Sequence, residues 1–168
     1  MKLKHLLHAF FFLAVSLLTA CGGGGGDTTA QPTTATLKLS TSGTLASGTS
    51  LAGIGISVVL PSGVTVKTNA DGSVASGKVV VSGVAAPGSF APPIYTPANG
   101  TTPAKLSFVM VSNASAGFGT GEFATVVCDI AAGSDPKTTD FTLADFKPVD
   151  LKGAAVSGLT ANVTVTMQ

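Results

Sequence analysis

The chain has 168 residues, of which 45% are hydrophobic and only 10% charged, and its formal net charge is +1. This length suits one domain of ordinary size and excludes a large multidomain enzyme. The low content of charged residues excludes a disordered polyelectrolyte and a basic nucleic-acid-binding protein, so we expect no nucleic-acid partner.

The start of the chain has the pattern of a lipoprotein signal peptide, which we assign to residues 1–20. Two lysines, Lys2 and Lys4, precede an apolar run from Leu6 to Leu18. This order is typical of a secretory signal peptide, and the run is shorter than the roughly 20 residues of a membrane span. The four residues that end in Cys21, Leu-Thr-Ala-Cys, resemble the lipobox of bacterial lipoproteins. The resemblance implies cleavage before Cys21 and covalent diacylglycerol and palmitate on that residue. We expect no cofactor besides this lipid.

Residues 21–34 are predicted to form the lipidated end and a flexible tether. Five consecutive glycines at 22–26 are followed by a short polar stretch, a composition that cannot form a core. In Gram-negative lipoproteins an Asp directly after the lipidated Cys marks retention in the inner membrane, and this chain has Gly22 there. The resemblance therefore implies an outer-membrane lipoprotein, lipid-anchored on the periplasmic face or at the cell surface.

Removal of residues 1–20 takes away both histidines and two of the nine lysines, which leaves a net charge of −1. Without histidine the remaining chain cannot form a Ser-His-Asp triad, a Cys-His pair or an imidazole metal site. An alternative hydrolase with an Asp-based site would need two suitably spaced carboxylates. Five acidic residues follow one another closely but lack EF-hand spacing: Asp129, Asp135, Asp140, Asp145 and Asp150. We therefore expect no catalytic residues, no metal site and no enzyme activity.

From residue 35 to the end, apolar and polar residues alternate with a period of two, which predicts β-strands. In chain order the alternating runs are 37–39, 54–60, 64–66, 78–84, 105–110, 124–130 and 162–166. Turn signals rich in Gly, Pro, Asn and Asp separate these runs. The pattern predicts an antiparallel β-sandwich of jelly-roll type with about seven to nine strands. Thr142–Phe146 is the exception, because it is predicted to be a short helix or turn with Thr139 or Asp140 as its cap.

Two short features lie among the predicted strands. The alternation places Cys128 on the same strand face as Val126 and Ile130, so we expect a buried thiol without reactivity. The glycine-rich segment 117–121 lacks a following helix and a Lys-Ser/Thr ending, so it is predicted to be a hairpin loop rather than a phosphate loop.

The segment 85–102 differs from the rest because it contains four prolines, which cannot donate to a β-ladder. We predict an irregular loop or a sheet edge there. Its apolar side chains are a candidate contact surface, although they could also cover an open end of the core. With the aromatic residue of the predicted hairpin loop, the candidate binding residues are Phe90, Ile94, Tyr95 and Phe118.

The predicted strands resemble those of cohesin domains and related carbohydrate-binding-module sandwiches. The resemblance extends over about residues 35–168, and its strongest segments are Gly121–Ile130, Phe141–Leu143, Val149–Gly153 and Leu159–Val165. The predicted strands at 37–39 and 54–60 fit the same pattern. The resemblance implies a cohesin-like β-sandwich that is a non-catalytic binding module. It assigns no binding residues.

Together these observations predict a membrane-anchored lipoprotein that presents a cohesin-like module at the cell envelope. The expected role is protein–protein interaction or scaffolding, with an envelope or secreted protein as the partner. The alternative is a carbohydrate-binding module that docks on polysaccharide. A flat exposed patch containing Tyr95 and Phe118 would favour the alternative, and burial of both rings would count against it.

Overall fold

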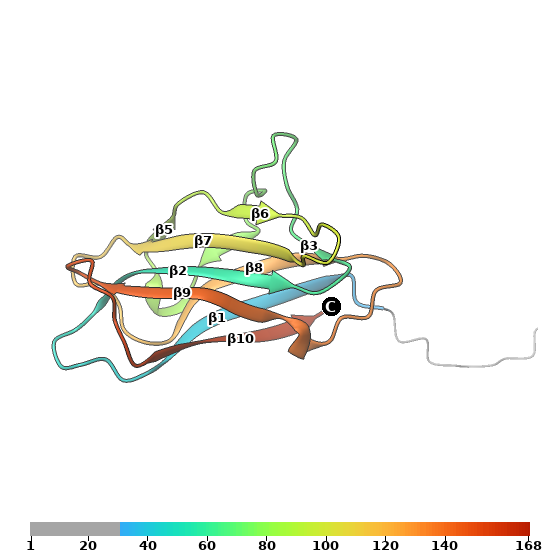
Figure 1. The fold of residues 1–168 in the computed structure, drawn as a ribbon. Coiled ribbons are helices and arrows are strands. Elements are labelled where there is room, and N and C mark those ends of the chain that lie inside the picture. Colours follow the sequence, from blue (N-terminus) through green and yellow to red (C-terminus); the bar gives the residue numbers. More distant parts are fainter. Residues whose placement is uncertain (1–30) are drawn as a thin grey trace, which may run out of the picture. The chain divides into compact units, whose positions relative to one another are not determined.

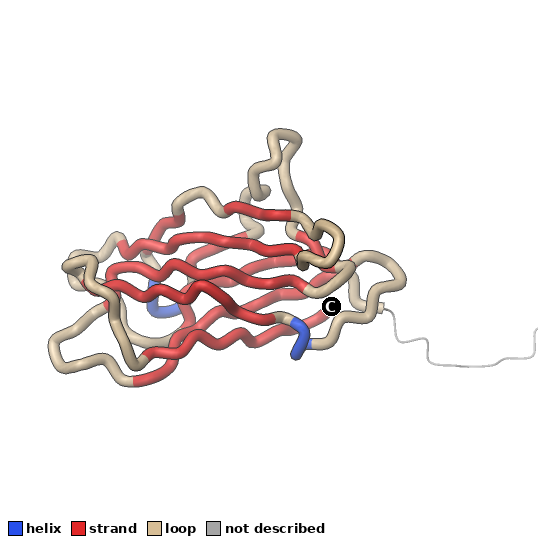
Figure 2. Tube along the Cα trace, viewed as in Figure 1, coloured by secondary structure: helices blue, strands red, loops and turns tan. Residues whose placement is uncertain are grey.

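A computed structural model describes residues 31–168 as two antiparallel β-sheets packed face to face (Figures 1 and 2). The predicted signal peptide, Cys21 and residues 21–30 of the predicted tether lie outside the described residues. The first strand begins at Thr34. No helix within residues 31–168 is long and apolar enough to cross a membrane.

One sheet, called sheet A here, has the strand order β10-β1-β8-β3, with β4 also paired to β8. Its strands are β1 (Thr34–Gly43), β3 (Val64–Thr65), β4 (Val79–Val81), β8 (Glu122–Ile130) and β10 (Leu159–Met167). β1 pairs antiparallel with β10 from Ala35–Met167 to Gly43–Leu159 without a register shift, and with β8 through one irregularity between Leu39 and Ser40.

The second sheet, called sheet B, has the order β5-β7-β2-β9, with β6 also paired to β7. Its strands are β2 (Leu51–Leu60), β5 (Gly88–Phe90), β6 (Ile94–Thr96), β7 (Ala104–Ser112) and β9 (Thr142–Asp150). The central strands β2 and β7 pair without a register shift, whereas β9 pairs with β2 through two irregularities.

The core lies between the sheets because each long strand directs alternate side chains inward. In sheet A the inward residues include Leu37 and Leu39 of β1 and Val126 of β8, all with no exposed surface. In sheet B they include Ile54 of β2 and Leu106 of β7, which are also fully buried. This two-layer core confirms the predicted all-β sandwich.

The local expectation at the start of β9 was wrong. The predicted short helix at Thr142–Phe146 is the first half of strand β9, and a 3₁₀ turn lies just before it at Thr138–Asp140. The predicted cap was also misplaced: the 3₁₀ turn has Lys137 as its N-cap, and the carboxylate of Asp140, its third residue, accepts a hydrogen bond from the backbone N–H of Lys137 at 2.8 Å. Pairing of β9 with β2 then favours a strand over any local helical tendency.

The described residues contain ten strands rather than the seven to nine predicted, because edge positions are occupied by short pieces. The proline-rich segment 85–102 contributes two of these pieces, β5 and β6, both paired to β7. Pro92 and Pro93 separate them. The segment is therefore a sheet edge, as its prolines indicate. The glycine-rich loop 117–121 was predicted to be a hairpin loop, and this was wrong: it connects β7 of sheet B to β8 of sheet A, so the chain crosses between the sheets there.

We predict that inward-facing residues of β1 contribute much more to the free energy of unfolding than outward-facing residues of the same strand. Leu37→Ala should lower the free energy of unfolding by about 2–5 kcal/mol, because Leu37 is fully buried between the sheets. Thr36→Ala, one residue away on the opposite face, should change it by less than about 1 kcal/mol. Urea denaturation of both variants measures the difference, and equal losses would contradict the assignment of faces.

Candidate binding face

The outer surface of sheet B carries an apolar groove above its central strand β2. Two of the outward positions of β2 are glycines, Gly53 and Gly55, which lie opposite Val111 and Val109 of β7. On the other side they lie opposite Val149 and Lys147 of β9. Because the glycines have no side chains, the neighbouring strands border a hollow of about 410 Å³.

Packing against the neighbouring strand requires glycine at position 53 but not at position 55. A Cβ atom on Gly53 would lie 2.9 Å from the carbonyl oxygen of Met110, so close packing of β2 on β7 excludes a side chain there. A Cβ atom on Gly55 would meet nothing closer than 3.8 Å. Packing within the domain therefore does not require Gly55. A glycine inside a strand without a packing role is typical of a place where another molecule approaches closely.

Exposed apolar side chains gather on this same face. The described residues contain six large hydrophobic side chains that are strongly exposed, and four of them border sheet B. These four, with their exposed fractions, are Ile94 (66%), Val109 (48%), Val111 (44%) and Leu151 (52%). A second hollow of about 300 Å³ extends the groove from Val109 towards Ile94 and Pro92. We call this continuous surface over β7, β2 and β9 the B face.

A polar cluster lies at one end of the B face. The Ser57 hydroxyl donates to the Asp145 carboxylate at 2.9 Å and shares a hydrogen bond with the Ser107 hydroxyl at 2.8 Å. Lys105 lies 3.5 Å from the same carboxylate oxygen. The hydrogen bond from Ser57 and the charge of Lys105 hold the pKa of Asp145 below its usual range. The groove therefore has an apolar centre and a charged end.

Asp145 reaches this position through a β-bulge in β9. Its φ is 55°, and it is the sole described non-glycine residue with positive φ. Asp tolerates the left-handed region better than most residues. The register between β2 and β9 shifts at the same place, between Gly55 and Ser57. The bulge turns the carboxylate towards Ser57, as bulges commonly re-aim side chains.

The outer surface of sheet A has a different character. Its outward positions are mostly Thr, Ser, Asn, Lys and acidic side chains, for example Lys38, which lies 3.2 Å from Glu122, and Lys78, which lies 3.1 Å from Asp129. Val127 is its outward valine on the central strand β8, and it is half-buried. The two faces of the sandwich thus differ in polarity, and the apolar one is the B face.

The four residues proposed from the sequence are not gathered in one patch. Ile94 is the most exposed of them and borders the B face. Phe90 is half-buried and packs edge-on against Phe108, with ring centroids 5.2 Å apart. Phe118 is 6% exposed and belongs to the core, where its backbone pairs with Leu51. Its ring is therefore not available to a ligand in this structure.

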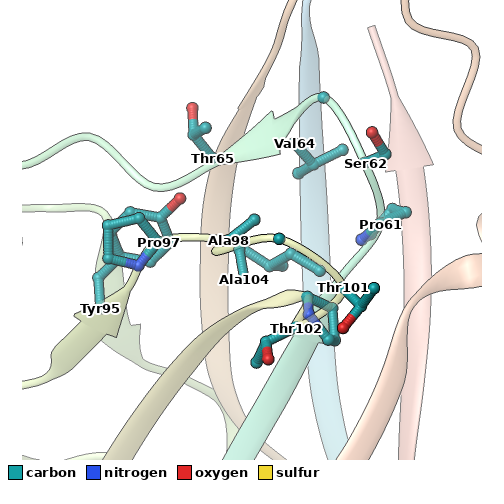
Figure 3. A pocket seen from close by; sticks show the side chains of 14 residues that line it. Pro61, Ser62, Val64, Thr65, Tyr95, Pro97, Ala98, Thr101, Thr102 and Ala104 are labelled. Atoms are coloured by element: carbon teal, nitrogen blue, oxygen red, sulfur yellow. The ribbon is translucent and has the colours of Figure 1, made fainter.

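Tyr95 lies at one end of the sandwich, beside a pocket of about 490 Å³ (Figure 3). The pocket lies between the turn at Pro61–Val64 and the loop at Pro97–Pro103, and its lining contains no charged residue. Tyr95 is half-buried, and burial raises the pKa of its hydroxyl. The lining offers hydroxyl and backbone groups but no pair of acid and base for catalysis.

The acidic residues considered in the sequence are dispersed. Asp145 lies on the B face, Asp129 pairs with Lys78 on sheet A, and Asp135 pairs with Lys137. Asp150 accepts hydrogen bonds from the backbone of the turn that follows β9. Within residues 31–168 no three His, Cys, Asp or Glu side chains come close enough to hold a metal ion.

Sequence reasoning missed the main part of the B face. Val109 lay in the predicted strand 105–110, but only the inward residues of that strand were considered, and Val111 lay just beyond its predicted end. A valine at the outward position of a strand, opposite a glycine in a neighbouring strand, was the available signal. It could not be recognised without the register that sets Val109 beside Gly55.

Comparisons with known proteins give one structural likeness. No protein-family model matches the chain, and no curated protein matches it. A solved structure, a non-cellulosomal cohesin from the hyperthermophilic archaeon Archaeoglobus fulgidus, is similar with a TM-score of 0.48 and 14% sequence identity. The similarity covers 76% of this chain and 75% of that one.

The buried thiol of Cys128 provides a test of the core packing. Cys128 has no exposed surface, and burial, with a smaller effect of the Asp129 carboxylate, raises its pKa from 9.0 to about 12. In a Cys21→Ser chain, where Cys128 is the single thiol, a thiol reagent at pH 8 should react about 10³-fold more slowly with the folded domain than with the denatured chain. Similar rates in both states would contradict the burial.

The same pKa shift gives a dependence of stability on pH. Above pH 9 the unfolded chain loses the Cys128 proton while the folded domain retains it up to a pH of about 12. The free energy of unfolding should therefore fall as the pH rises through this window, by up to about 1.4 kcal/mol per pH unit. Urea denaturation at several pH values should show that Cys128→Ala loses this part of the slope. Identical slopes in both chains would contradict the prediction.

Proposed function

We propose that this domain is a non-catalytic module that binds another protein through the B face. The observation that carries the proposal is the concentration of exposed apolar side chains there, since four of the six such residues in the described chain border this face. Large contiguous apolar patches are uncommon on the free surface of a monomeric protein and mark interaction sites.

The composition of the B face supports a protein partner. Val109, Val111 and Ile94 supply apolar area for a buried centre, and Lys105, Lys147 and Asp145 supply charges at its margin. An apolar centre with a polar rim is the usual anatomy of a protein–protein interface. The open position above Gly55 allows a partner's side chain or backbone to approach the sheet closely.

The alternative of a polysaccharide ligand has less support. Glycan-binding surfaces stack sugar rings on exposed aromatic rings, but Phe118 is buried and Phe90 packs against Phe108. Tyr95 is half-buried at the end of the sandwich and not on the B face. The cohesin-like strand pattern also fits a protein-binding role.

A matched pair of variants tests the binding face. Val109→Lys places a charge at the centre of the B face, and Val127→Lys places the same charge on the central strand of the opposite face. Residues 31–168 should capture a stoichiometric protein from envelope and secreted fractions of the native cell, assayed with and without calcium. Val109→Lys should weaken that capture at least about tenfold, and Val127→Lys should leave it unchanged.

Three results would contradict this proposal. The first is equal capture by the wild type and Val109→Lys, and the second is loss of capture by Val127→Lys when both variants unfold at similar urea concentrations. The third is no capture by the wild type under either calcium condition. The last result together with retention on polysaccharide would support the carbohydrate-binding alternative.

We further propose that the module is held at the outer membrane by lipid on Cys21. The support is the lipobox-like sequence and the five glycines that follow it. Cys21→Ser should abolish acylation, as measured by the intact mass of the protein, and should release it from the membrane fraction. A Cys21→Ser protein that stays membrane-bound would overturn this anchoring.

A further inference from the structure

The edge strands of the two sheets are protected to different degrees. Exposed edge strands can pair with other chains, and proteins usually guard them with short length, proline, charge or bulges. The edge of sheet A at β3 and β4 consists of pieces of two and three residues. The edge of sheet B at β5 and β6 is interrupted by Pro92 and Pro93. Both edges are therefore guarded.

The third edge, β9, is guarded in three ways. It contains the bulge at Asp145, it contains Pro148, and its last part is covered by the chain's own following turn. In that turn Asp150 N–H donates to the carbonyl of Ala154 at 2.9 Å, and Val156 N–H donates to the carbonyl of Pro148 at 3.0 Å. Little of the β9 edge is left for another strand.

The fourth edge, β10, has none of these devices. Its nine residues contain no proline, no glycine and no charged side chain, and its ladder with β1 has no bulge. Figure 1 shows it running along the lower side of the molecule. β10 lies near β9 and the turn at Thr138–Asp140, but within residues 31–168 its one paired strand is β1. Within the described residues the edge is therefore long and regular, and no strand is paired to its outer side.

The phase of the ladder identifies the free backbone groups of β10. Thr34 and Gln168 exchange two backbone hydrogen bonds of 2.9 Å, so they form a hydrogen-bonded pair. Because bonded and non-bonded pairs alternate in an antiparallel ladder, the even-numbered residues of β10 bond to β1. The odd-numbered residues direct their N–H and C=O groups away from β1: Leu159, Ala161, Val163, Val165 and Met167.

The side chains of these odd-numbered residues are also incompletely covered. They face the core but are only half-buried, whereas the inward residues Leu37 and Leu39 of the neighbouring strand β1 have no exposed surface. One further strand beside β10 would cover the apolar side chains and satisfy the free backbone groups together. The β10 edge is therefore a place where a further strand could extend sheet A.

We propose that β10 pairs antiparallel with β10 of a second copy of this chain, about a two-fold axis at Val163, so that the two A sheets become continuous. In this register Val163 lies opposite the second Val163, Ala161 opposite Val165, and Leu159 opposite Met167. Each of these residues has its free backbone groups on the side of the partner strand. The pairing is isologous, as in most homodimers.

The side chains of β10 make a second copy a suitable partner. Apolar residues meet apolar residues on the core side, and on the outer side Thr160 meets Thr166 and Asn162 meets Thr164. No charged side chains face each other across this pairing, and Thr and Asn side chains that lie opposite each other can form hydrogen bonds. The B face is on the other sheet, so it stays open to a different partner in the dimer.

The oligomeric state tests this proposal. Residues 31–168 contain every described strand and the whole described core, so they are suitable for sedimentation over a range of concentrations. The wild type should show a monomer–dimer equilibrium. Thr164→Lys, which brings two lysines close to the axis, should weaken dimerisation at least about tenfold. Thr36→Lys, on the outer face of the interior strand β1, and Val109→Lys, on the B face, should leave it unchanged.

Disulfide cross-linking tests the proposed register between the two copies of β10. Asn162 and Thr164 of two copies would form a non-hydrogen-bonded pair, whose Cα atoms are about 4.5 Å apart and suit a disulfide. A mixture of Asn162→Cys and Thr164→Cys chains should therefore cross-link to a heterodimer several times faster than either chain alone. Cross-linking at equal rates would overturn the proposed register.

Two further results would overturn the proposal. One is a wild-type domain that stays monomeric at the highest concentration measured. The other is a dimer of residues 31–168 that is lost when residues 22–30 are added, because that result would assign the β10 edge to the chain's own N-terminal segment. Capture of another protein by the B face bears on neither result, so the two proposals can fail separately.

Discussion

The alternation of side chains along β2 is the constraint on which the rest of the structure depends. The even-numbered residues Ile54, Ile56 and Val58 point into the core, and each is 3% exposed or less. The odd-numbered residues Gly53, Gly55 and Ser57 lie on the outside of sheet B. A shift of one residue would expose the core residues and bury the glycines, so burial of the even-numbered residues also fixes the surface.

The groove, the bulge and the polar cluster of the B face all follow from this arrangement. The glycines of β2 leave the valines of β7 standing above the sheet, and Ser57 offers a hydroxyl where β9 bulges. The hydroxyl and Lys105 hold Asp145 ionised at the end of an otherwise apolar surface. Sheet A has no outward-facing glycines within its central strands, and its outer face is mostly polar, with Val80 as an exposed exception. Residues 31–168 therefore have one apolar outer face, on sheet B, and at β10 a long regular sheet edge that no described strand pairs with.

The sequence predicted the sandwich, the buried Cys128 and the sheet edge at 85–102, because strand alternation and proline act locally. It failed at Thr142–Phe146, where pairing with β2 outweighs a local turn signal. It also placed Phe118 at the surface, because a glycine-rich loop gives no sign that its one aromatic ring folds inward. The B face and the β10 edge depend on registers between distant strands, such as Gly55 with Val109, and no local pattern specifies such a register.

Site-specific photo-cross-linking in the native cell tests most directly whether the B face binds another protein. A photoreactive side chain would be placed at position 109 on the B face or at position 127 on the opposite face. We predict that position 109 yields a discrete cross-linked product with another protein and that position 127 does not. Products from position 127 alone, or from neither position, would contradict the assignment of the B face as the binding surface.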